Sequence, residues 1–162
     1  MARVPGQGVT CWMGRIQEPA LRDLADRWSP IVQELLYEIG QRVWPPKKIK
    51  RSIFSKAEFI MRFSVEGPVQ FGDRAAWALS HTSRPSGFDS SGTLSKGERE
   101  FWLLTLENGN PPLFRIEGAS VEERIPASRE NLLDALNSAR KHGPRVETYF
   151  GNKGPLSHRA TS

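Results

Sequence analysis

Apolar residues recur at steps of three and four over residues 21–43, and this pattern constrains the fold of the chain more than any other. The spacing gives a helix one broad apolar face, with most charged residues on the other side, and so predicts a long amphipathic helix. Pro30 lies inside the pattern, where proline removes one backbone hydrogen bond and clashes with the preceding turn. Either the helix kinks there, or Ser29 caps a second helix that begins at Pro30. The Pro45-Pro46 pair ends the helical segment, because the residue before a proline is pushed out of the helical region.

Short segments with alternating or continuous apolar residues predict strands, which we expect over residues 59–65, 75–80, 101–106, 113–117 and 146–150. Residues 107–112 contain Asn, Gly and Pro, which favours a hairpin with a longer than minimal loop between the third and fourth strands. Residues 81–97 are rich in Ser and Gly and poor in apolar residues. We expect them to form one long loop, either mobile or used for binding.

A second helix is indicated by the chemistry at its two ends. Ser128 is a favourable N-cap, and Glu130 suits the positive end of a helix. Basic residues suit the negative end, and Gly143-Pro144 supplies a stop. The segment therefore predicts a helix with Leu132 and Leu136 on its buried face.

Together these elements predict an α+β domain with a mostly antiparallel sheet of four to five strands. An N-terminal long or kinked helix and a C-terminal helix pack on this sheet. We expect an irregular segment over residues 1–17, a single α+β domain over 18–150, and a polar tail over 151–162. A chain of 162 residues is long enough to bury about two thirds of the surface that its unfolded form exposes.

The charges of the chain are segregated along the sequence, although the net charge is only +5. Residues 42–62 contain seven cations and one anion, and residues 140–162 contain five cations and one anion. The segment between them, 64–139, has seven cations and eleven anions. Segregation of this kind creates a local field that attracts partners of opposite charge.

The first basic segment combines Trp44 with four cations and has Phe54 nearby, the pairing of stacking surface and positive charge that single-stranded nucleic acid sites use. We therefore expect a non-catalytic binding or assembly module that engages an anionic macromolecule, either nucleic acid or an acidic protein surface. The alternative is that the cations are solvated surface and that Trp44 seals the end of the helix. The candidate anion-binding residues are Trp44, Lys47, Lys48, Lys50, Arg51, Arg140, Lys141 and Lys153.

The Cys11-Trp12 pair, followed by a long helix, resembles the surroundings of the nucleophile in papain-like cysteine peptidases. His81 and Asn108 follow in the order that such an enzyme needs. The resemblance implies a cysteine-dependent hydrolase in which His81 deprotonates Cys11 and Asn108 orients the imidazole. A third alternative is a small-molecule site between the helices and the sheet, for which the sequence names no residues.

The remaining patterns favour no metal and no cofactor. The three histidines, His81, His142 and His158, lie far apart, and none has a second ligand at a helical spacing. No window approaches the about 20 apolar residues that a membrane-spanning helix needs, and the N-terminus lacks the apolar stretch of a signal peptide. The single cysteine agrees with a reducing compartment. We therefore expect a cytoplasmic protein without a membrane partner, and the oligomeric state stays open.

Overall fold

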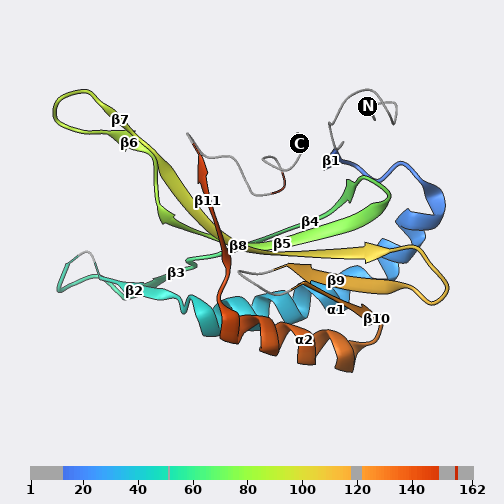
Figure 1. Ribbon diagram of the computed structural model, residues 1–162. Helices are drawn as coiled ribbons and strands as arrows, with labels where there is room; N and C mark the ends of the chain where they lie inside the picture. Colours follow the sequence, from blue (N-terminus) through green and yellow to red (C-terminus); the bar gives the residue numbers. More distant parts are fainter. Residues whose placement is uncertain (1–12, 51, 118–121, 150–155, 157–162) are drawn as a thin grey trace.

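The structure, a computed structural model, describes residues 13–50, 52–117, 122–149 and 156. Two helices lie on the same face of a twisted antiparallel sheet (Figure 1), which confirms the α+β prediction. The helices are α1 (Pro19–Val43) and α2 (Arg129–His142). The strands are β1 (Met13–Gly14), β2 (Lys47–Ile49), β3 (Glu58–Ile60), β4 (Ser64–Phe71), β5 (Arg74–Arg84), β6 (Gly87–Phe88), β7 (Leu94–Ser95), β8 (Gly97–Glu107), β9 (Leu113–Glu117), β10 (Glu122–Pro126) and β11 (Arg145–Tyr149).

The main sheet has seven strands in the order β1-β4-β5-β8-β9-β10, and β11 also pairs with β8. β9 pairs with residues 103–107 of β8, while β11 pairs with residues 97–101. β5 and β8 have eleven residues each and form the centre of the sheet. The sheet is larger than expected, because the short strands β1 and β10 extend it at its two edges.

α1 is a single helix of 25 residues that continues through Pro30. The alternative of a second helix capped by Ser29 is therefore wrong, and the Ser29 hydroxyl instead accepts a hydrogen bond from Trp77 Nε1 at 3.4 Å. The apolar stripe of α1 is buried as its spacing predicts, including Leu21, Leu35 and Ile39. Within the described ranges, no helix is both long enough and apolar enough to cross a membrane.

α2 begins and ends as its terminal residues predict. The Ser128 side chain accepts a hydrogen bond from the backbone N–H of Asn131 at 3.1 Å, which satisfies one of the free donors of the first turn. Gly143 follows the helix with a φ of 78°, a conformation that favours glycine. Leu132 and Leu136 are buried against the rest of the core.

The main core lies between the helices and the sheet. Trp77 and Trp102 from the two central strands are buried there, and Trp28 of α1 packs edge to face on Phe114 with ring centroids 5.2 Å apart. The opposite face of the sheet carries a smaller apolar cluster of Ala76, Ala78, Phe101, Leu103 and Leu156. Both faces of the sheet are thus partly covered.

Two expectations about the strands are wrong. Residues 81–97 are not one loop, because β5 extends to Arg84, β8 begins at Gly97, and β6 and β7 form a hairpin between them. The Asp89 carboxylate fixes the tip of that hairpin by accepting hydrogen bonds at 2.9 Å from the backbone N–H groups of Ser91 and Thr93. Residues 59–65 are also not one strand, since residues 61–63 separate β3 from β4. The polar strand residues between 81 and 97 are stabilised by pairing with other strands, and amino-acid composition alone does not reveal such pairing.

Candidate anion-binding site

Trp44 lies directly after α1 and is only 6% exposed. Its ring stacks on His81 with centroids 5.0 Å apart and an interplanar angle of 17°, and it also contacts Trp102 at 5.5 Å. The expectation that Trp44 offers a stacking surface to a ligand is therefore corrected. The ring seals the end of α1 against the core, where aromatic pairs of this geometry stabilise the fold.

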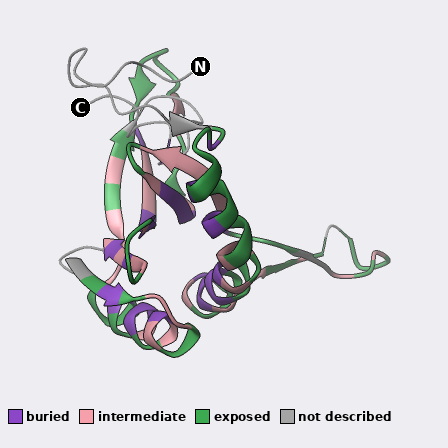
Figure 2. Ribbon diagram, turned by 90° about the vertical axis from the view of Figure 1, so that its right-hand side faces the viewer, coloured by how far each residue is buried: buried purple, intermediate pink, exposed green. Residues whose placement is uncertain are grey.

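The first basic segment forms a hairpin that projects from the rest of the chain (Figure 2). We call residues 47–60 the basic hairpin. Lys47, Lys48 and Lys50 are exposed on it, and Lys56 is exposed on the return side. Arg51 lies outside the described residues. The two-stranded hairpin therefore presents several cations to solvent.

The tip of the basic hairpin is ordered by a small hydrogen-bond network. The hydroxyl of Ser55 accepts a bond from the backbone N–H of Ser52 at 3.0 Å and donates to the Ser52 carbonyl at 2.9 Å. The turn leaves Ile53 81% exposed and Phe54 92% exposed. Among the side chains that the structure describes here, Phe54, and not Trp44, is thus the aromatic one that accompanies the lysines at the surface.

The second basic segment begins, at the end of α2, on the same side of the molecule as the basic hairpin. α1 and α2 pack against each other and run in the same direction, so that both end on the left of Figure 1. Arg140 and Lys141 are exposed in the last turn of α2. Lys153 falls outside the described residues. Arg145 instead lies 3.3 Å from Glu117 and over the ring of Phe101, within the sheet.

A cavity of about 380 Å³ lies at the base of the basic hairpin, where β4 begins and β5 continues past it. We call it the Arg62 cavity. None of the described residues that line it is acidic. They are Met61, Arg62, Phe63, Ser64, Ser80, His81, Thr82 and Arg99.

A polar network forms one wall of the Arg62 cavity. Arg99 Nη1 donates a hydrogen bond to the Ser80 hydroxyl at 3.2 Å, and the hydroxyls of Ser80 and Ser64 are 3.0 Å apart. Ser80 also donates to Glu66 Oε1 at 3.3 Å, and the same carboxylate oxygen lies 3.7 Å from Arg99 Nη1. Ser80 is 1% exposed, so the network is fixed within the sheet.

His81 lies on the other wall of the cavity, between Trp44 and Glu100. Burial lowers the pKa of its imidazole, and the nearby Arg62 guanidinium lowers that pKa further. Glu100 acts in the opposite direction, with its Oε2 3.7 Å from His81 Nδ1. The ring is therefore held in its neutral form over a wider pH range than a free histidine.

The proposed orienting residue of a papain-like site is far from His81. His81 pairs in register with Glu100, and Asn108 lies eight residues further along the same segment. At the usual rise of a strand this is a separation of about 26 Å, so Asn108 cannot orient the imidazole. Cys11 lies outside the described residues. In the described part of the chain, no three His, Cys, Asp or Glu residues are grouped as metal ligands.

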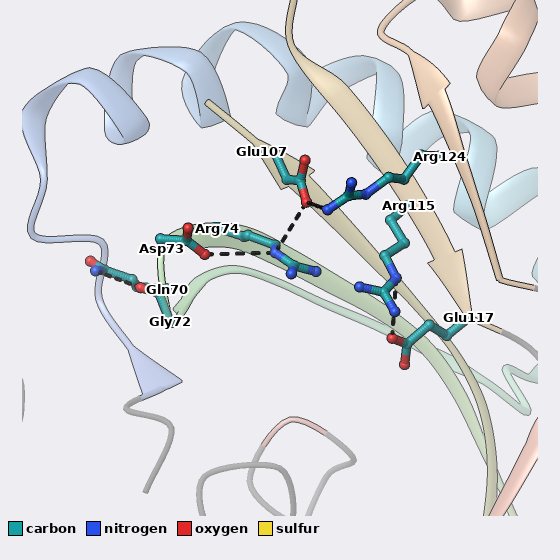
Figure 3. A network of polar contacts seen from close by, with 8 residues as sticks. All are labelled: Gln70, Gly72, Asp73, Arg74, Glu107, Arg115, Glu117 and Arg124. Carbon is teal, nitrogen blue, oxygen red and sulfur yellow. Dashed lines mark hydrogen bonds and ion pairs between the residues drawn. The ribbon is translucent and has the colours of Figure 1, made fainter. Parts of the chain in front are cut away.

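A second polar cluster lies at the opposite end of β5 (Figure 3). Arg74 Nε is 3.6 Å from Asp73 and 3.5 Å from Glu107, and Arg124 binds the same Glu107 oxygen at 2.9 Å. We call these four residues the Arg74 cluster. It borders a cavity of about 490 Å³ lined by Glu18, Asp73, Arg74, Glu107, Asn108, Gly109 and Arg124. The three carboxylates exceed the two arginines in this lining.

The small-molecule alternative can be compared with a third cavity, of about 300 Å³, between α2 and β10. Its lining contains the carboxylate of Asp134 and the polar residues Asn131 and Ser138, together with Ile125 and Ala135. A few polar groups beside apolar residues are usual for a small-ligand site, so the small-molecule alternative stays a prediction.

The chain matches no known protein in three comparisons, with models of protein families, with curated proteins and with solved structures. Sequence reasoning missed the Arg62 cavity, whose residues come from three separate segments. The available signal was the position of Ser80 and Arg99, each a polar residue beside an apolar run in a central strand.

Proposed function

We propose that this chain is a non-catalytic binding module whose basic hairpin engages an anionic macromolecule, with single-stranded nucleic acid as the favoured partner. The observation that carries the proposal is the exposure of Phe54 at the tip of a projecting hairpin that bears Lys47, Lys48, Lys50 and Lys56. A base stacked on an exposed aromatic ring gains about 1–3 kcal/mol, and neighbouring lysines neutralise the phosphates that flank it.

The favoured partner follows from the combination of ring and charge. An acidic protein surface would use the lysines, but it would gain from Phe54 only by offering an apolar pocket as well. Every base of a single strand has a face on which an aromatic ring can stack, whatever its sequence. Arg140 and Lys141, at the same end of the molecule, add to the positive field there.

Fluorescence anisotropy with a labelled single-stranded oligonucleotide at several salt concentrations tests the proposal. The Lys47→Glu/Lys48→Glu/Lys50→Glu variant should weaken binding by at least about tenfold and reduce the salt dependence, because each lost phosphate contact removes about 0.7 from the log–log slope. Phe54→Ala should weaken binding by about 5-fold to 150-fold while leaving the salt slope unchanged.

A matched control separates the hairpin from the overall charge of the chain. Arg15→Glu/Arg22→Glu/Arg27→Glu makes the same change in net charge at exposed positions near the other end of α1, and it should weaken binding much less. Equal losses in both triple variants would contradict a hairpin site. Absence of binding at low salt, or tight binding to anionic vesicles or an acidic protein in place of the oligonucleotide, would contradict the favoured partner.

A further inference from the structure

The Arg62 cavity is a concave site whose lining, as far as the structure describes it, carries positive charge and hydroxyl groups and no carboxylate. Two guanidinium groups, from Arg62 and Arg99, border it together with the hydroxyl-bearing residues Ser64, Ser80 and Thr82. Its volume of about 380 Å³ is within the range of about 300–1,000 Å³ that is usual for small-ligand sites. A lining of this composition disfavours cations and favours anions.

The two arginines of the cavity differ in a way that suits the capture of an anion. Arg99 is 12% exposed and is held in place by Ser80 and Glu66. Arg62 is exposed, and among the described carboxylates it has no ion-pair partner. The two guanidiniums can therefore bind the same group, since binding of an anion by Arg62 breaks no ion pair between described residues.

The histidine in the lining adds a group that can respond to the ligand. His81 faces Arg62, Arg99 and Glu100, and its ring is stacked on Trp44. A bound anion would offset the two arginines and favour the protonated imidazole. Trp44, which stacks on His81, comes shortly before Lys47 in the sequence, so the cavity and the basic hairpin are neighbours.

We propose that the Arg62 cavity binds a phosphate group through Arg62 and Arg99. A phosphate group carries up to two negative charges and several acceptor oxygens, which matches two guanidiniums and nearby hydroxyl donors better than a single carboxylate does. The group comes either from a small phosphorylated molecule or from the terminal phosphate of a nucleic acid strand. The inference does not rest on the proposed function, because its residues are distinct from the lysines of the hairpin.

Isothermal titration calorimetry with inorganic phosphate, with acetate as the carboxylate comparison, tests the site directly. Wild-type protein should bind phosphate, and Arg62→Gln should weaken that binding about tenfold, a loss expected for one charge-assisted contact. Thr82→Val, which keeps the shape of the side chain but removes its hydroxyl, should cause a smaller loss. Arg84→Gln is the matched control, since Arg84 is an exposed arginine of β5 that does not line the cavity.

The source of the phosphate is distinguished by comparing oligonucleotides with a 5′-phosphate and with a 5′-hydroxyl. Tighter binding of the phosphorylated strand, lost in Arg62→Gln, identifies a strand terminus, whereas equal binding of both strands with retained phosphate affinity identifies a small molecule. No phosphate binding by wild-type protein, equal binding of acetate, or equal losses in Arg62→Gln and Arg84→Gln would overturn the proposal. If oligonucleotide binding still depends on Lys47, Lys48 and Lys50 in that case, the cavity proposal alone has failed.

Discussion

The arginines at the two ends of β5 are compensated to different degrees. At the start of the strand, Arg74 is shared between Asp73 and Glu107, and Glu107 also holds Arg124. Near the other end of the β4–β5 pair, just before β4 begins, Arg99 is paired with Glu66, but Arg62 has no ion-pair partner among the described carboxylates. Arg74 and Arg124 are therefore neutralised within the protein, whereas Arg62 borders a cavity and has no such partner in the described part of the chain.

This difference indicates where free energy of binding is available. An anion that approaches the Arg74 cluster must compete with carboxylates already in place, so little is gained by exchanging one partner for another. At Arg62 an incoming anion displaces no carboxylate among the described residues. Charge segregation in the sequence predicted only that the basic segments attract anionic partners. Arg62 is the last cation of the first basic segment, but the sequence did not indicate that it borders a cavity.

The largest expected effect is a loss of stability when the Arg74 cluster is disrupted. Glu107→Gln removes the carboxylate that Arg74 and Arg124 share, and Glu107 and Arg74 are only 22% and 23% exposed. We expect a loss of about 1–2 kcal/mol in the free energy of unfolding, less than for a fully buried pair because solvent screens Arg124. Urea unfolding measures the change.

Two comparisons make this result specific. Arg62→Gln removes an arginine without a described ion-pair partner and should change stability by no more than about 0.5 kcal/mol. Glu98→Gln affects a more exposed pair, with Arg84 at 3.9 Å, and should also be nearly neutral. Equal losses in all three variants would show that the two ends do not differ in the way described.

The sequence predicts the helices and the fold class because the relevant interactions are local. Periodic apolar residues from Leu21 onward, the Ser128 cap and the Gly143 stop all act within a few residues of their own position. The sequence also predicts most strands of the sheet. Their ends were harder to place, since Arg84 and Gly97 belong to strands only through pairing across the sheet.

The candidate site was less predictable because its geometry depends on contacts between distant segments. Trp44 fits both a surface platform and a core seal, and only its stacking with His81, far along the chain, decides between them. The Arg62 cavity exists because strand register places Ser64 opposite Ser80 and brings Arg99 beside them. The exposed lysines of the basic hairpin were predictable, since a run of cations next to a proline pair has no apolar face to bury.

A second prediction sharpens the comparison by removing a negative charge beside the Arg62 cavity. Glu66 is the carboxylate that lies beside Arg99 and Ser80, although it is outside the cavity lining. Glu66→Gln keeps the shape of the side chain and removes its charge, so phosphate affinity should rise about threefold to tenfold. Titration calorimetry measures the gain. The matched variant Glu98→Gln, near the same strand ends, should change affinity less, and equal changes in the two variants would contradict an anion site beside Glu66.

The smallest expected effect concerns the pH dependence of stability. Burial and Arg62 lower the pKa of His81 in the folded protein below the value of about 6.5 that is usual for an unfolded chain. In the interval between these two pKa values the unfolded state binds more protons than the folded state. The contribution of His81 to stability is therefore complete above about pH 6.5, and it falls as the pH is lowered from there toward the pKa of the folded protein. Arg62, Arg99 and Glu100 are the charged groups that face the ring, and Glu100 makes the shift smaller than burial alone would.

Thermal unfolding at several pH values, with and without phosphate, measures this last effect. His81→Gln removes the titrating ring and should lose less stability than wild-type protein as the pH is lowered from 7.5 to 5, while His142→Gln, at an exposed position, should behave like wild type. Saturating phosphate should reduce the pH dependence of wild-type protein, because a bound anion offsets the two arginines and raises the pKa of His81 again. If phosphate leaves the profile unchanged although it binds, the anion lies away from His81, and the uncompensated charge of Arg62 is then directed at solvent and not into the cavity.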